Sequence, residues 1–93
     1  MIFLKEHLSG TYDWPSENER ILLDTVPSRR LFNRWNGYQT LFVINLFLLQ
    51  AGLALEQYGK KAENILHAKL PLDDMSEKKV LAWLNAQTGD IIS

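Results

Sequence analysis

Three arginines gathered in one short stretch are the side chains of this sequence best suited to bind an anion. Arg29, Arg30 and Arg34 follow a proline. A helix over this stretch would place Arg30 and Arg34, four residues apart, on one face. Guanidinium groups bind phosphates and carboxylates through paired hydrogen bonds. The stretch therefore predicts contact with an anionic partner, and ion pairs to carboxylates of the same chain are the simpler alternative.

Nucleic acid is one anionic partner to consider. A short basic helix after a proline turn resembles the recognition helix of a helix-turn-helix. The whole chain, however, carries 10 basic and 11 acidic residues and a formal net charge of −1. Nucleic-acid-binding proteins usually have a basic excess, because phosphate contacts supply most of their affinity. A small nucleic-acid-binding transcriptional regulator using Arg29, Arg30 and Arg34 is therefore kept as the alternative function.

The histidines and carboxylates predict no metal site. Glu63 and His67 are four residues apart and share a helix face, but they supply two ligands where metal sites need three or four. We expect a surface ion pair between them. Asp73, Asp74 and Glu77 form an acidic cluster that helix capping explains, and they lack the longer alternation of oxygen ligands in a calcium loop.

Catalytic motifs are missing from the sequence. No serine lies in a Gly-X-Ser-X-Gly turn, and the glycines are scattered rather than gathered into a phosphate-binding loop. Nucleophilic catalysis also needs a base held against the nucleophile and a third group that orients the base. We expect a protein that is not an enzyme and that binds no cofactor and no metal.

An unusually apolar segment in mid-chain must organise the fold. Residues 41–55 read LFVINLFLLQAGLAL, and only Asn45, Gln50 and Gly52 interrupt the apolar run. The run is too long for an ordinary strand. As a helix over residues 38–58 it would have no polar face, so it must be enclosed on nearly every side.

Shorter helices are predicted ahead of this segment. Ser16 and Glu19 form a capping-box pattern before a helix that Pro27 ends. Ser28 is expected to cap a second short helix, which residues 36–37 (Asn-Gly) end as a left-handed signal.

Two further helices are predicted after it. Residues 60–70 have amphipathic spacing, and Gly59 before them is read as the end or kink of the preceding helix. Asp74 and Glu77 suggest a capping box for a last helix, which Gly89 closes before a short tail. Residues 2–8 fit either a strand or a helical turn.

These elements predict an all-α fold. We expect residues 1–93 to form a single helical domain, a small bundle of about five helices around the central helix of residues 38–58. The chain has no cysteine, which fits a reducing cytoplasm.

We consider three environments for the central helix. A membrane span needs about 20 apolar residues, which the run does not reach, so membrane insertion is not expected. The second environment is the core of its own chain. The third is an interface with another chain: so small a domain has few elements with which to cover a helix, and two-fold pairing would bury the apolar surface left uncovered. The predicted partner or dimer contacts are Leu41, Phe42, Ile44, Asn45, Leu48, Leu49 and Trp83.

The sequence thus favours a protein–protein interaction module. It would be a small adaptor, regulator or chaperone-like subunit that works through helix-on-helix burial and self-associates. Trp35 joins Trp83 as a candidate anchor, because interface hot spots are rich in tryptophan.

Overall fold

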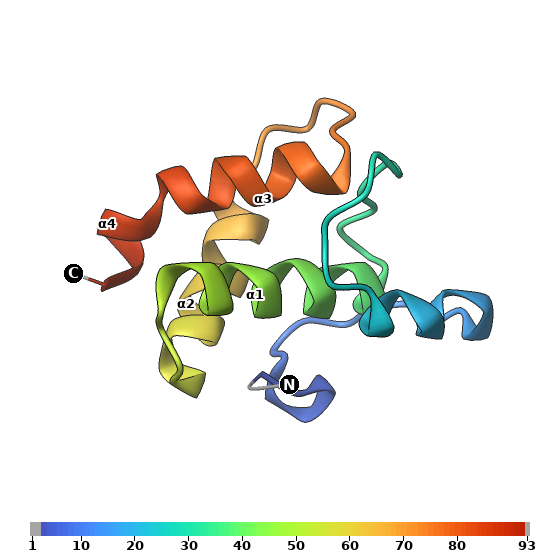
Figure 1. Cartoon of the computed structure of the whole chain (residues 1–93), viewed down its shortest axis with the longest axis horizontal. Coiled ribbons are helices and arrows are strands. Elements are labelled where there is room, and N and C mark those ends of the chain that lie inside the picture. The colour runs from blue at the N-terminus through green and yellow to red at the C-terminus, as the bar shows by residue number, and fades with distance from the viewer. Residues whose placement is uncertain (1–2, 93) are drawn as a thin grey trace.

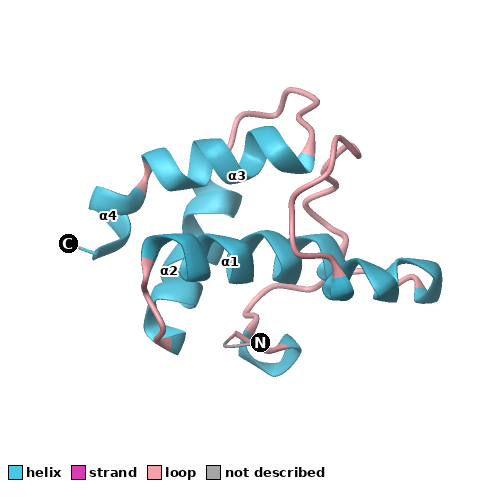
Figure 2. Cartoon of the chain, viewed as in Figure 1, coloured by secondary structure: helices cyan, strands magenta, loops and turns pink. Residues whose placement is uncertain are grey.

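The computed structural model describes residues 3–92, and over these residues the chain forms helices and loops without a strand (Figure 2). The predicted all-α fold is confirmed. In chain order the elements are the 3-10 helices η1 (Lys5–His7) and η2 (Ser16–Leu23) and the α-helices α1 (Gly37–Ala51), α2 (Glu56–Lys69), α3 (Glu77–Ala86) and α4 (Thr88–Ile92). Helix α1 lies at the centre and packs against η2, α2 and α3 (Figure 1).

The central helix is shorter than predicted, because Gly52 ends it. At its start the Asn36 side chain accepts hydrogen bonds from the backbone N–H groups of Tyr38 and Gln39. At its end Gly52 takes the left-handed conformation, with φ at 69°, which glycine adopts without steric cost. The predicted helix over 38–58 is therefore two helices joined by a turn, and Gly59 lies inside α2 rather than at a helix end.

Its own chain covers α1 almost completely. The buried apolar side chains of the core come from α1, from the helices around it and from the N-terminal segment; they are Phe3, Ile21, Leu41, Phe42, Val43, Ile44, Leu46, Phe47, Leu48, Ala62, Leu66, Leu70, Val80, Leu81, Leu84 and Ile91. No helix in the described part of the chain is both long enough and apolar enough to cross a membrane.

The N-terminal segment contributes to this cover. Residues 5–7 form a short 3-10 helix, whereas Met1 and Ile2 lie outside the described residues. The Asn45 side chain accepts a hydrogen bond from the Phe3 N–H (2.9 Å) and donates one to the Phe3 carbonyl (2.8 Å). The buried Phe3 ring then lies against Gly59 of α2, so close that a methyl group there would come within 2.3 Å of a ring carbon.

The helix predicted over residues 28–36 is wrong. These residues, called the extended stretch below, have bends at 29–30 and a turn at 34–35, and between them Leu31 bridges to Ser76. There the stretch pairs with the start of α3, since the Phe32 N–H donates to the Met75 carbonyl (2.8 Å) and the Glu77 N–H donates to the Arg30 carbonyl (2.8 Å). Ser28 caps no helix. Its hydroxyl donates to the Glu77 carboxylate instead (3.0 Å). Backbone N–H and C=O groups that we predicted to bond within a local helix bond instead to a segment distant in sequence.

Three helix ends also differ from the prediction. Ser16 is the first residue of η2 and not its cap, and the residue before it makes no side-chain capping bond. Ser76 caps α3 by accepting from the Lys79 N–H, in place of Asp74. Thr88 begins α4, so Gly89 lies within a helix and the expected tail is helical up to residue 92. Ser93 lies outside the described residues.

Candidate functional site

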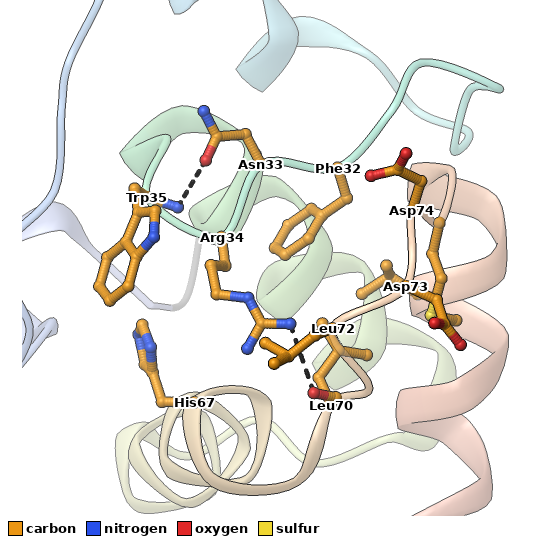
Figure 3. A pocket seen from close by; sticks show the side chains of 11 residues that line it. Phe32, Asn33, Arg34, Trp35, His67, Leu70, Leu72, Asp73 and Asp74 are labelled. Atoms are coloured by element: carbon orange, nitrogen blue, oxygen red, sulfur yellow. Dashed lines mark hydrogen bonds between the residues drawn. The ribbon is translucent and has the colours of Figure 1, made fainter.

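A surface pocket lies where the extended stretch before α1 meets the loop between α2 and α3 (Figure 3). Its volume is about 590 Å³, within the range of ligand-binding pockets. Its walls come from two parts of the chain far apart in sequence. The lining residues are Phe32, Asn33, Arg34, Trp35, His67, Leu70, Leu72, Asp73, Asp74, Met75 and Val80.

Apolar side chains form both the floor and part of the rim of this pocket. Leu70 and Val80 are buried members of the core, and Phe32 and Met75 pack against it. At the rim, Trp35 is 54% exposed and Leu72 is 89% exposed. Large apolar groups left in water beside a cavity are typical of a binding surface.

Arg34 ties the two walls of the pocket together. Its Nη2 donates to the carbonyl oxygens of Leu70 (3.3 Å) and Pro71 (2.9 Å). Figure 3 shows its side chain reaching from the extended stretch across to the loop after α2. These hydrogen bonds therefore fix the position of one wall of the pocket relative to the other.

His67 forms the end wall next to Trp35, and two residues behind it fix its orientation. The His67 and Trp35 rings lie 5.5 Å apart. The His67 Nε2 lies 2.6 Å from the Tyr12 hydroxyl oxygen, and the same hydroxyl donates to the Glu63 carboxylate. Because the phenol has one proton and gives it to Glu63, its oxygen accepts from the Nε2–H of His67.

Glu63 is the buried charge on which this arrangement rests. It is only 1% exposed, so the predicted surface ion pair with His67 is wrong. Its carboxylate accepts from the Ser9 N–H (2.8 Å) and the Gly10 N–H (3.1 Å) as well as from Tyr12. Backbone and phenol donors together replace the water that the carboxylate loses on burial.

The phenol of Tyr12 is held in its neutral form. Burial of the ring, the hydrogen bond to Glu63 and the negative charge of Glu63 all raise the pKa of Tyr12 well above its usual value near 10. At neutral pH the Tyr12 hydroxyl therefore keeps its proton and donates it to Glu63.

A second buried carboxylate lies at the other end of the extended stretch. Glu77 is fully buried and accepts from the Nε (2.8 Å) and Nη2 (2.9 Å) of Arg30 and from the Gln39 side chain (2.8 Å). The hydrogen bond to Glu77 raises the pKa of Arg30 above its already high value, against the effect of burial. This cluster fixes the extended stretch to α1 and α3 and lines no part of the pocket.

The structure does not bring the three arginines onto one face. Arg29 is exposed, Arg30 points inward to Glu77, and Arg34 lies in the pocket. The predicted helical arrangement of Arg30 and Arg34 is thus wrong, because Arg30 lies in a bend and Arg34 in a turn, with no helix between them.

Most of the predicted contact residues on α1 are buried within the chain. Leu41, Phe42, Ile44 and Leu48 belong to the core. Asn45 holds the backbone of the N-terminal segment. Leu49 is 70% exposed and Trp83 is half-buried, so these two remain open to another chain.

Of the pocket residues, the sequence indicated Trp35 as an anchor and Arg34 as an anion contact, and it missed Leu72 and Met75. In the α2–α3 loop the sequence marked the acidic residues Asp73 and Asp74, which were interpreted as helix-capping groups, and Pro71 between two leucines was the signal for its apolar rim. No group of three side chains able to hold a metal ion occurs among residues 3–92.

Comparisons of the chain with models of protein families, with curated proteins and with solved structures find no match.

Proposed function

We propose that this chain is a non-enzymatic protein-interaction module that binds a segment of a partner protein in the pocket between the extended stretch and the α2–α3 loop. The observation that carries the proposal is the exposure of Trp35 and Leu72 at the rim of a cavity with an apolar floor. Burying such groups on binding is favourable, at roughly 25 cal/mol per Å² of apolar surface.

The preformed shape of the pocket supports the same proposal. Arg34 joins the two walls, and Tyr12 and Glu63 hold His67 from behind. A partner then meets a site that needs little ordering, which lowers the entropic cost of association. We place this activity in the cytoplasm, in keeping with the absence of cysteine.

Self-association through α1 is not part of this proposal. The sequence argument for it was an apolar helix with uncovered sides, and the chain covers those sides itself. The nucleic-acid alternative gains no support either, because Arg30 and Arg34 are engaged within the chain.

Peptide selection tests the proposal. A random peptide library displayed on phage is selected on the chain, and synthetic copies of the enriched peptides are titrated against the unchanged chain and against Leu72→Gln. We expect affinity to fall at least tenfold, because the substitution removes an apolar side chain from the rim and leaves the charge of the pocket unchanged. Leu23→Gln is the matched control, since Leu23 is 83% exposed on η2 away from the pocket.

Two results would overturn the proposal. One is a selection in which no peptide binds. The other is a set of peptides that bind Leu72→Gln as tightly as the unchanged chain, since their site would then lie elsewhere.

A further inference from the structure

We infer that the segment bound in this pocket carries a basic side chain, lysine or arginine, next to its apolar anchor. The inference rests on the proposed function and adds the chemistry of the partner. Its basis is a difference between the charged groups of the pocket: Arg34 and His67 bind groups of the same chain, whereas Asp73 and Asp74 do not.

The cationic side of the pocket is partly engaged. The Arg34 guanidinium donates from one nitrogen, Nη2, to two backbone carbonyls. His67 donates its Nε2–H to Tyr12, which is in turn bound to Glu63. An anionic ligand would have to compete with these contacts or bind the N–H groups of Arg34 that they do not use.

The anionic side is free. Asp73 and Asp74 are exposed on the α2–α3 loop, and within the described residues neither carboxylate makes a hydrogen bond or an ion pair. Arg34 lines the same pocket, yet it binds neutral carbonyls and leaves both carboxylates without a partner. Figure 3 shows the two aspartates on the side of the pocket opposite Trp35 and His67.

Trp35 offers the same ligand a second contact. Its indole is half-exposed at the rim, and an indole face attracts a nearby lysine or arginine cation. The apolar floor of Phe32, Leu70 and Met75 lines the same pocket, and the Arg34 side chain lies between the aspartates and the ring. A peptide that places an apolar side chain on the floor brings a neighbouring basic side chain to the rim, where the aspartates on one side or the indole on the other can hold it.

The experiment is a double-mutant cycle on peptides enriched by the selection described above. Each peptide is made in its selected form and with its basic residue changed to glutamine. Both forms are titrated against the unchanged chain and against the double variant Asp73→Asn/Asp74→Asn. We expect the double variant to bind the basic form about tenfold more weakly and the glutamine form equally well. Added salt should weaken the basic form only.

Glu17→Gln/Glu19→Gln is the control, because it removes two exposed carboxylates from η2, outside the pocket. It should leave the affinity for either form unchanged.

The outcomes separate this inference from the proposed function. Peptides that lose affinity for Leu72→Gln but carry acidic residues, or that bind Asp73→Asn/Asp74→Asn as tightly as the unchanged chain, overturn the basic ligand and leave the pocket in place. Peptides that bind Leu72→Gln as tightly as the unchanged chain overturn the pocket itself.

Discussion

At the scale of single residues, this protein buries two carboxylates and satisfies each with donors from distant parts of the chain. Glu63 receives backbone N–H groups and a phenol, and Glu77 receives a guanidinium and a side-chain amide. A buried charge left without partners costs several kcal/mol, so each set of donors has a measurable effect on stability.

Tyr12→Phe removes the phenol that joins Glu63 to His67. We expect the free energy of unfolding at neutral pH to fall by about 1–2 kcal/mol, because a buried carboxylate loses a donor and the imidazole loses an acceptor. Urea denaturation measures the change. Tyr58→Phe is the control, since no hydrogen bond of its hydroxyl occurs in the described structure.

The same phenol predicts a dependence on pH. Because the folded state raises the pKa of Tyr12, the stabilisation is complete below pH 10 and is lost as pH rises above it. Over that range the unfolded chain releases a proton that the folded chain keeps. The unchanged protein should therefore lose up to about 1.4 kcal/mol per pH unit more than Tyr12→Phe. Equal slopes for the two proteins above pH 10 would contradict this assignment.

Arg30→Met leaves the fully buried Glu77 without its charged partner. We expect stability to fall by about 3 kcal/mol, at the lower end for a broken buried pair because Arg30 itself is partly exposed. Arg29→Met, at the exposed neighbouring position, should change it by less than about 0.5 kcal/mol. The double variant Arg30→Met/Glu77→Gln should cost less than the two single changes added together. Additive costs in urea denaturation would mean that the pair does not interact in this way.

At the scale of elements, helices that carry a strong local signal could be predicted from sequence. The apolar run over residues 41–55 predicted a central helix, which the structure has as α1 but ends at Ala51, and the spacing of Ala62, Leu66 and Leu70 identified α2. The pair Asn36 and Gly37 was interpreted as a helix end, whereas Asn36 caps the start of α1. Both roles are common for asparagine beside glycine, and only the neighbouring structure distinguishes them.

The extended stretch before α1 shows why the candidate site could not be predicted. Leu31, Phe32 and Trp35 have helical spacing, but the backbone of this stretch pairs with the start of α3. Arg30 and Glu77, 47 residues apart, secure that pairing. A pocket whose walls meet only through such contacts leaves no local pattern, so sequence indicated individual lining residues and not their association.

Packing of the N-terminal segment on α2 depends on Gly59. Gly59→Ala would place a methyl group 2.3 Å from a carbon of the Phe3 ring, so we expect it to destabilise the fold by about 1–3 kcal/mol. Gly89→Ala is a matched control with the opposite expected sign, because Gly89 lies in α4 with open space around it and alanine favours a helix. The measurement is the midpoint of urea denaturation of Gly59→Ala, of Gly89→Ala and of the unchanged protein. A Gly59→Ala midpoint at or above that of the unchanged protein would contradict this packing.

At the scale of the whole molecule, non-helical segments complete the cover of the central helix. The N-terminal segment lies on one side of α1 and the extended stretch on another, each held by a polar side chain of α1, Asn45 or Gln39. We expected so short a chain to leave part of this helix uncovered, because we considered only other helices as cover. Loops with well-placed hydrogen bonds enclose it as effectively.

This closure predicts the solution mass. With its central helix covered, the chain should sediment as a monomer of 10.8 kDa across a range of concentrations. Leu49→Glu should leave that mass unchanged. A mass that rises with concentration and returns to the monomer value in Leu49→Glu would restore self-association through this end of α1.

The bridge from Arg34 to the carbonyls of Leu70 and Pro71 spans 36 and 37 positions of the chain. A molecule bound beside these hydrogen bonds contacts both walls of the pocket. It therefore binds the folded chain and not the unfolded chain, in which the two walls are apart. Occupancy must then delay thermal melting, by a free energy that grows with the logarithm of ligand concentration above the dissociation constant. Thermal-shift screening of small compounds and short peptides can therefore search for occupants without labels, immobilisation or any prior assumption about their chemistry.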